Sequence, residues 1–146
     1  MTTYVTENHK LDDVRGLLDR FIKESVHANH SVRDDNVATI VQHPDILTVV
    51  AYREDTPVGL LMATEWCHPL FSGKLVSDML VYVVPEHRGS MLGSRFVKVI
   101  ERWAQVRQAD RIMLGQSTGI GDINRVIKFY EKLGYTATGF NCTKEL

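Results

Sequence analysis

The order of the predicted elements indicates an α/β domain with a mixed β-sheet. Three strand-like segments occupy the middle of the chain, and the third begins a strand–helix–strand–helix–strand series. No internal repeat and no linker rich in proline, glycine or serine divides the 146 residues. We therefore expect a single domain over residues 1–146, because each half alone would be too small to bury a good core.

The amino-terminal part predicts one short strand and two helices. The strand is residues 2–6, and a helix follows at about residues 8–26, where apolar side chains recur at three- and four-residue steps. A shorter helix begins at Asp34 or Asp35. It ends near His43, because the proline that follows disfavours helical geometry in the residue before it.

The middle of the chain predicts three strands, at residues 46–52, 58–66 and 75–84. The first two form a hairpin, because the sequence Glu-Asp-Thr-Pro at residues 54–57 is typical of turns. The third strand is apolar almost throughout. Such a pattern predicts burial on both faces, in the middle of the sheet.

The last third of the chain predicts two amphipathic helices, each followed by a strand. Apolar stripes run along residues 92–106 and residues 123–133. Gly134 stands where a left-handed helix cap is expected. The two strands are residues 111–115 and residues 135–143.

The composition argues against several classes of partner. With 17 basic and 18 acidic residues, the net charge of −1 disfavours a nucleic acid or an anionic membrane as partner. The first residues lack the basic and apolar regions of a secretory signal, and no apolar run approaches the roughly 20 residues that span a bilayer. Cys67 and Cys142 are too few for a disulfide framework, so we expect reduced, buried or half-buried thiols in a cytoplasmic protein.

An anion-binding turn is the most informative feature of the sequence. Residues 81–94 run from a strand through a tight turn into a helix, whose first turn has unpaired N–H groups and positive dipole character. The turn offers a cation, small residues and hydroxyl groups, namely Arg88, Gly89, Ser90, Gly93 and Ser94. The segment predicts a site for a diphosphate, although the glycine patterns of dinucleotide sites and of P-loops are both absent.

A second motif, Phe-Tyr-Glu-Lys-Leu-Gly-Tyr at residues 129–135, ends the last helix. Together with Val-Val-Pro-Glu-His-Arg-Gly-Ser-Met-Leu-Gly at residues 83–93, it resembles the GCN5-related N-acetyltransferase (GNAT) family. The resemblance covers the second half of the chain closely and the first half by the order of elements. It implies a mostly antiparallel, twisted sheet flanked by about four helices. In this fold a splayed central strand pair forms a slot for acetyl-CoA.

The resemblance also implies how the co-substrate acetyl-CoA is held. The turn from Arg88 to Gly93 would bind its pyrophosphate, with Met91 replacing the first glycine of the family motif. The preceding strand would bind pantetheine through backbone groups, and an N–H near Val83 would stabilise the thioester oxyanion. Asn124 lies one residue later than the family's asparagine. The implied cofactor-binding residues are Val81, Tyr82, Val83, Arg88, Gly89, Ser90, Met91, Leu92, Gly93, Ser94 and Asn124.

Candidate catalytic residues follow from the same resemblance and from the chemistry of amine acylation. Tyr130 occupies the position of the family's catalytic acid, where a phenol can protonate the leaving thiolate; the alternative is a core aromatic with a satisfied hydroxyl. A base must also take a proton from the amine. Asp78 is the best candidate, because burial in an apolar strand would raise its pKa. Glu65 is the second candidate, and His30 and His68 are further alternatives.

We expect an N-acetyltransferase that transfers acetyl directly from acetyl-CoA to a primary amine of a small molecule or to an exposed amino group. The alternatives are a protein or peptide acetyltransferase and a non-catalytic acyl-CoA-binding module. A cationic amine would suit acidic residues if these converge, namely Glu24, Asp34, Asp35, Glu65 and Asp78. No metal site is expected, because His27 and His30 lack further ligands. Either a monomer or a homodimer is compatible with the resemblance.

Overall fold

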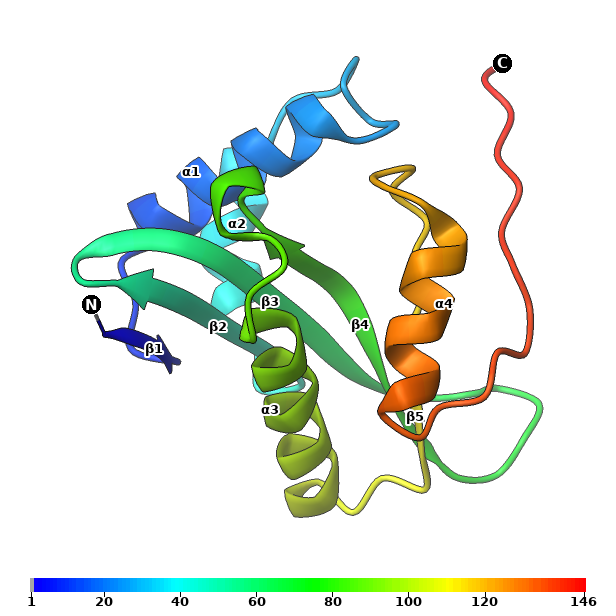
Figure 1. The fold of residues 1–146 in the computed structure, drawn as a ribbon. Coiled ribbons are helices and arrows are strands. Elements are labelled where there is room, and N and C mark those ends of the chain that lie inside the picture. Colours follow the sequence, from blue (N-terminus) through cyan, green and yellow to red (C-terminus); the bar gives the residue numbers. More distant parts are fainter. Residues whose placement is uncertain (1) are drawn as a thin grey trace.

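The computed structural model describes residues 2–146, which form five strands and four α-helices (Figure 1). The strands are β1 (Thr3–Thr6), β2 (Ile46–Arg53), β3 (Thr56–Cys67), β4 (Lys74–Val83) and β5 (Arg111–Met113). The helices are α1 (Leu11–Glu24), α2 (Asp34–Val41), α3 (Leu92–Val106) and α4 (Ile123–Lys132). A short 3-10 turn, η1 (Pro85–His87), joins β4 to the segment before α3.

The strands form one sheet in the order β1-β2-β3-β4-β5. The first three neighbouring pairs are antiparallel, and β4 pairs with β5 in parallel. The predicted mixed, mostly antiparallel sheet with about four flanking helices is therefore confirmed. The long β2–β3–β4 meander forms its centre, and the β4–β5 pairing is short, with Leu75, Val76 and Ser77 opposite residues 111–113.

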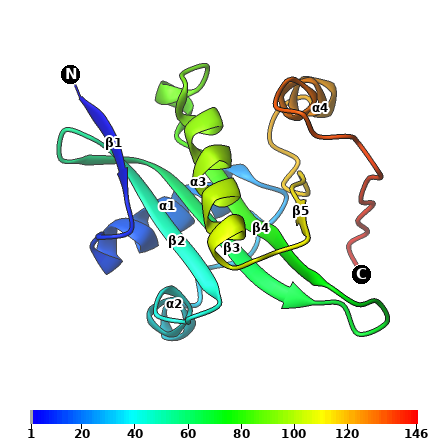
Figure 2. The ribbon, with the colours of Figure 1, turned by 90° about the horizontal axis from the view of Figure 1, so that it is seen from below.

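Helices cover both faces of the sheet (Figure 2). α1 and α2 lie on one face, where α1 buries Val14 and Leu17. α3 lies on the other face and buries Phe96 and Ile100. These are the apolar stripes that the helical periodicity predicts. By contrast, α4 contributes no fully buried residue, so it adds little to the core.

The predicted elements of the first half are confirmed with small shifts at their ends. α1 begins at Leu11 instead of residue 8, because the amide of Asn8 donates to the hydroxyl of Thr6 (2.9 Å) in a local turn. The β2–β3 hairpin is closed as predicted, with Glu54 in the left-handed region at φ 55°. β4 is less buried than its apolar sequence predicts, and Met79 is 48% exposed. The neighbouring strand β5 pairs with only the first part of β4 and does not reach Met79.

The predicted final strand at residues 135–143 is wrong. Residues 135–146 have no regular secondary structure, and Phe140 is 86% exposed. A strand needs a neighbouring edge to pair with, and β5 offers only three residues. Gly139 and Asn141 also disfavour extended pairing. The predicted strand at residues 111–115 is likewise shortened to β5.

Two smaller expectations concern the thiols and the membrane. Cys67 and Cys142 are both free and exposed, so the predicted burial of these side chains is wrong. Each lies at or beyond the end of a strand-like segment, where packing no longer covers it. Among residues 2–146, no helix combines the length and the apolar character that crossing a membrane requires.

Phe96 gives the first testable prediction, because it is fully buried and packs on Gly59, where an added Cβ would lie 3.0 Å from the Phe96 Cε2 atom. Replacing Phe96 with alanine should lower the free energy of unfolding by about 3–5 kcal/mol. Val106, on the same helix, is 74% exposed, so Val106→Ala should change it by less than about 0.5 kcal/mol. Urea denaturation measures both. Equal effects would contradict the placement of α3.

Candidate active site

The site is built on an edge of β4 that has no partner strand. β5 pairs with β4 only as far as Ser77. At the next residue, the carboxylate of Asp78 accepts a hydrogen bond from the amide of Gly115 (3.2 Å), and the two segments then diverge. A bulge in β4 lies at the same place, since Met79 has no partner on β3. We call residues 79–83 of β4, on the side away from β3, the splayed edge.

Backbone groups of two predicted residues point to the splayed edge. The amide of Val84 donates to the carbonyl of Val58 on the β3 side (3.0 Å). Because successive residues of a strand direct their backbone groups to opposite sides, those of Val83 and Val81 point away from β3. Tyr82 lies between them and directs its backbone groups to β3, with its side chain on the α1 face. Within the described chain no strand pairs with the splayed edge.

The turn after β4 leaves backbone amides at the start of α3 without acceptors among the described residues. Gly89 has φ +77°, which favours glycine. Residues 2–146 supply no acceptor to the amides of Gly93 and Ser94 in the first turn of α3. The two predicted hydroxyls are already used, because Ser90 donates to the carbonyl of His87 (2.7 Å) and Ser94 to that of Met91 (2.8 Å). The backbone amides are therefore the free donors of this turn.

Met91 and Gly93 are accommodated differently in the turn. Met91 has φ −76° and ψ 2°, an ordinary conformation, and its side chain is 70% exposed. The departure from the family glycine therefore introduces no backbone strain. A Cβ on Gly93 would lie 3.3 Å from the Phe129 Cζ atom. The missing side chain of Gly93 lets Phe129, on α4, approach the start of α3 closely.

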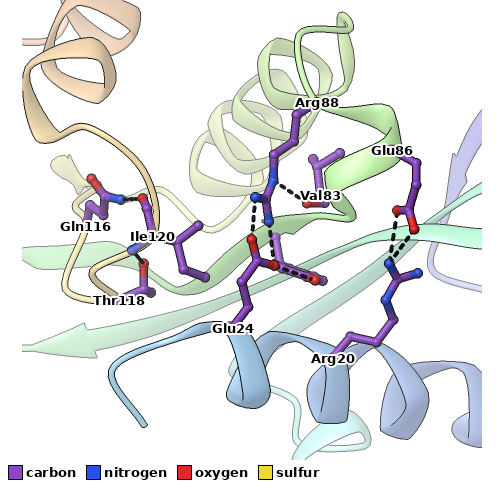
Figure 3. Close-up of polar contacts among 9 residues, drawn as sticks. Arg20, Glu24, Val83, Glu86, Arg88, Gln116, Thr118 and Ile120 are labelled. Carbon is purple, nitrogen blue, oxygen red and sulfur yellow. Dashed lines mark hydrogen bonds and ion pairs between the residues drawn. The ribbon is translucent and has the colours of Figure 1, made fainter. Parts of the chain in front are cut away.

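Arg88 is not a free cation (Figure 3). Its two terminal nitrogens bind the carboxylate of Glu24 at the end of α1, and its Nε atom donates to the carbonyl of Val83 (2.9 Å). The hydroxyl of Tyr82 also donates to Glu24 (3.0 Å). The hydrogen bond from Arg88 lowers the pKa of Glu24 below its usual range. Burial, followed by the bond to Glu24, raises the pKa of Tyr82 to about 12.

The pKa values of Asp78 and Tyr130 are both raised, and the charge of Asp78 contributes to the shift of Tyr130. Burial raises the pKa of Asp78 to about 6, although the hydrogen bond from Gly115 opposes the shift. Burial, followed by the negative charge of Asp78, raises the pKa of Tyr130 above that of an ordinary phenol. In the described part of the chain the Tyr130 hydroxyl has no hydrogen-bond partner, unlike a satisfied core tyrosine. The pair thus combines a carboxyl that ionises near neutral pH with a protonated phenol.

Glu65, the second candidate base, is committed elsewhere. It pairs with Arg107 and with Lys74 (3.1 Å), and the hydrogen bond from Arg107 lowers its pKa. Asp45 completes this cluster through Arg107. A carboxylate held by two cations is a weak proton acceptor, so the structure favours Asp78 over Glu65.

The acidic residues do not converge into one acceptor pocket. The acidic residues other than Asp78 have cations of their own, with Arg88 at Glu24 and Arg15 at Asp34 (3.6 Å). Asp35 lies 3.7 Å from the guanidinium of Arg33. The ion pairs of Glu24, Asp34, Asp35 and Glu65 neutralise these carboxylates locally, so they are poorly suited to attract a cationic amine.

The remaining predicted residues lie at the margins of the site. The amide of Asn124 donates to the capping carboxylate of Asp122 (2.9 Å), in the exposed first turn of α4. His68 stacks on Phe71 in the loop between β3 and β4, with ring centroids 4.5 Å apart. The His27 and His30 rings are 6.2 Å apart, and no cluster of three possible metal ligands occurs in residues 2–146.

One feature of the site has no local sequence signal. The amide of Val26, just after α1, donates to the carbonyl of Thr118 in the segment between β5 and α4 (2.9 Å). Gln116, in the same segment, donates to Ile120 and leaves its buried Oε1 atom without a partner. The end of α1 thus contacts both β4, through Glu24, and the segment opposite it. Because Val26 and Thr118 lie far apart in the sequence, only the folded structure shows that they are in contact.

A sequence model of the acetyltransferase (GNAT) family matches residues 14–135. The chain belongs to the GNAT family. It is therefore an acyltransferase of the acetyltransferase type. No curated protein matches it significantly by sequence.

Solved structures agree with this GNAT assignment at the level of the fold. A transcriptional regulator from Bacillus halodurans C-125 superposes with a TM-score of 0.80 and 16% identity, over 99% of this chain and 100% of that chain. An aminoglycoside acetyltransferase from an uncultured soil metagenomic sample has a TM-score of 0.78 and 18% identity, over 100% and 99%. Glucosamine-6-phosphate N-acetyltransferase from Arabidopsis thaliana has a TM-score of 0.77 and 19% identity, over 99% of both chains.

Proposed function

We propose that this GNAT enzyme transfers acetyl directly from acetyl-CoA to a primary amine of a small molecule or to an exposed amino group. One observation carries the proposal: Asp78, a carboxyl with a pKa raised to about 6, stands where the splayed edge begins, and its charge helps to keep the phenol of Tyr130 protonated. Paired groups with opposite proton tasks are what amine acylation needs.

The free backbone groups fit acetyl-CoA as the donor. The splayed edge offers the amide and carbonyl groups of Val81, which pantetheine can bind as an added strand would, and the amide of Val83 for the thioester oxygen, while the carbonyl of Val83 accepts from Arg88. The amides of Gly93 and Ser94 can bind the pyrophosphate at the start of α3. When bound, acetyl-CoA supplies the thioester. An aminoglycoside N-acetyltransferase of the same fold, AAC(6′)-Iy, is known in complex with CoA.

The side chains have separate tasks in the transfer. Asp78, ionised above about pH 6, takes a proton from the acceptor ammonium, directly or through water. The amine nitrogen then bonds to the thioester carbon. As the tetrahedral adduct collapses, the C–S bond breaks and the nitrogen loses its second proton to solvent. The amide of Val83 donates to the developing oxyanion. Tyr130, which burial keeps protonated, gives its proton to the leaving thiolate.

The acceptor is proposed only as a primary amine. Relatives of this fold are named for aminoglycosides, for glucosamine-6-phosphate and for an alanine of a ribosomal protein. A cavity of about 190 Å³ between β4 and the α1–α2 face is lined by apolar side chains that include Met79 and Leu80, and it could receive an apolar part of a small acceptor. A peptide amino group is the second candidate. A non-catalytic module would bind acetyl-CoA but would show no turnover with any amine.

Asp78→Asn tests the proposed base. In the wild type, kcat/KM should rise with pH through about 6, because the raised pKa leaves Asp78 protonated below that value. The variant should lose this rise and about 10²–10⁴-fold in turnover. Rates over pH 5–8 with an amine panel measure both. A profile that retains the rise would show that Asp78 is not the base.

Folding provides the control for this variant. The folded state favours protonated Asp78, so its stabilising contribution is complete below the unfolded pKa of 3.8 and is lost as pH rises through about 6. At pH 7 the charged carboxylate therefore destabilises the native state, and the neutral amide of the variant removes that charge. The variant should unfold at no lower urea concentration than the wild type at pH 7.

Tyr130→Phe tests the proposed acid. It should lower kcat by about 10²-fold or more while leaving the dissociation constant for acetyl-CoA nearly unchanged, because the hydroxyl acts on the leaving group. Tyr135→Phe is the matched control, since the Tyr135 hydroxyl only donates to Glu101 (3.1 Å) nearby. If both variants keep full turnover, Tyr130 is not the acid.

A further inference from the structure

The Arg88–Glu24 pair links the predicted pyrophosphate turn to α1. A guanidinium has five N–H donors, and three of those on Arg88 are committed, two to Glu24 and one to the carbonyl of Val83. The guanidinium also lies over the Tyr82 ring, 5.6 Å from its centroid. The cation expected to bind the pyrophosphate is therefore neutralised by a carboxylate from the end of α1 (Figure 3).

We propose that Glu24 competes with the diphosphate of the cofactor for Arg88. In this resting arrangement the carboxylate occupies the two terminal nitrogens with the fork geometry that a phosphate also uses. Diphosphate binding must break this pair before Arg88 can contribute its charge. Glu24 thus weakens cofactor binding through Arg88, without touching the cofactor itself. The inference rests on the proposed function, because it assumes that acetyl-CoA binds at this turn.

The surroundings of the pair support a reversible exchange. The side chains of Arg88 and Glu24 are 36% and 28% exposed, so water screens their attraction and a polyanion can displace the carboxylate. Glu24 does not depend on Arg88 for all its hydrogen bonds, since Tyr82 also donates to it. After its separation from Arg88, Glu24 would therefore still accept the hydrogen bond from Tyr82 and remain partly exposed to water. Arg20 lies one turn earlier on α1, but it is bound to Glu86 (2.8 Å).

The exchange also connects the turn after β4 with the segment between β5 and α4. Glu24 ends α1, and two residues later Val26 binds Thr118 in the segment after β5. The same stretch of chain therefore contacts both walls that flank the splayed edge. When the diphosphate binds Arg88, the end of α1 loses the ion pair between Glu24 and Arg88. It keeps the hydrogen bond from Val26 to Thr118.

Glu24→Gln tests the competition, because glutamine keeps the size of the side chain and can still accept from Tyr82 but loses the charge. Calorimetric titration with CoA should give a dissociation constant three- to ten-fold lower than that of the wild type, since a partly exposed ion pair of this kind is worth on the order of 1 kcal/mol. The affinity for acetylpantetheine, which lacks the diphosphate, should change less than about two-fold.

Glu86→Gln is the matched control. It removes a carboxylate from a neighbouring ion pair between η1 and α1, that with Arg20, and leaves Arg88 and Glu24 together. Its affinities for CoA and for acetylpantetheine should equal those of the wild type. A gain as large as that of Glu24→Gln would mean that total charge, and not the competition for Arg88, controls binding, and would overturn the proposal.

The double variant decides whether Glu24 acts through Arg88. In an Arg88→Gln background, Glu24→Gln should leave the CoA affinity unchanged, because the contested cation is absent. Unchanged or weaker CoA binding by Glu24→Gln alone would overturn the competition, as would an equal gain for acetylpantetheine or a gain that persists without Arg88. Failure of the wild type to bind CoA at all would instead overturn the proposed function.

Discussion

The site depends on a strand that loses its neighbour part-way along its length. β5 pairs with β4 at three residues and then diverges, so the groups of Val81 and Val83 face an edge that the chain itself does not fill. Unpaired backbone donors and acceptors at such an edge are a template for an extended ligand. The bulge at Met79 and the bond from Gly115 to Asp78 both lie where the divergence begins. The same constraint therefore creates the splayed edge and places the proposed base beside it.

The groups around this edge come from four separate parts of the chain. The start of α3 supplies backbone amides, β4 supplies Asp78, α4 supplies Tyr130, and the end of α1 supplies Glu24. α4 has no fully buried residue, and its approach to α3 depends on the missing side chain of Gly93. Stability and function are therefore divided within the molecule, since the core lies in β2–β4, α1 and α3 while the proposed acid stands on a lightly packed helix.

Local signals predicted most of the fold, and contacts between distant residues explain what they missed. Helical periodicity and turn residues predicted the helices and the β2–β3 hairpin, and the Arg88–Gly93 motif predicted the turn before α3. The final strand failed because pairing depends on a partner edge that no local pattern reports. The ion pairs of Glu65 and Glu24 join residues 42 and 64 positions apart, so composition could suggest their chemistry but not their partners. The raised pKa of Asp78 was predictable because this residue lies in a mostly apolar strand.

Amide hydrogen exchange, measured residue by residue with and without saturating acetyl-CoA, tests the central claim most directly. The amides of Val81 and Val83 should exchange quickly in the free protein and slow on binding, as pantetheine pairs with the splayed edge. The amide of Val84 already donates to Val58 and should be protected in both states. If the cofactor binds while Val81 and Val83 exchange as fast as before, the diverging strand is not where it is held.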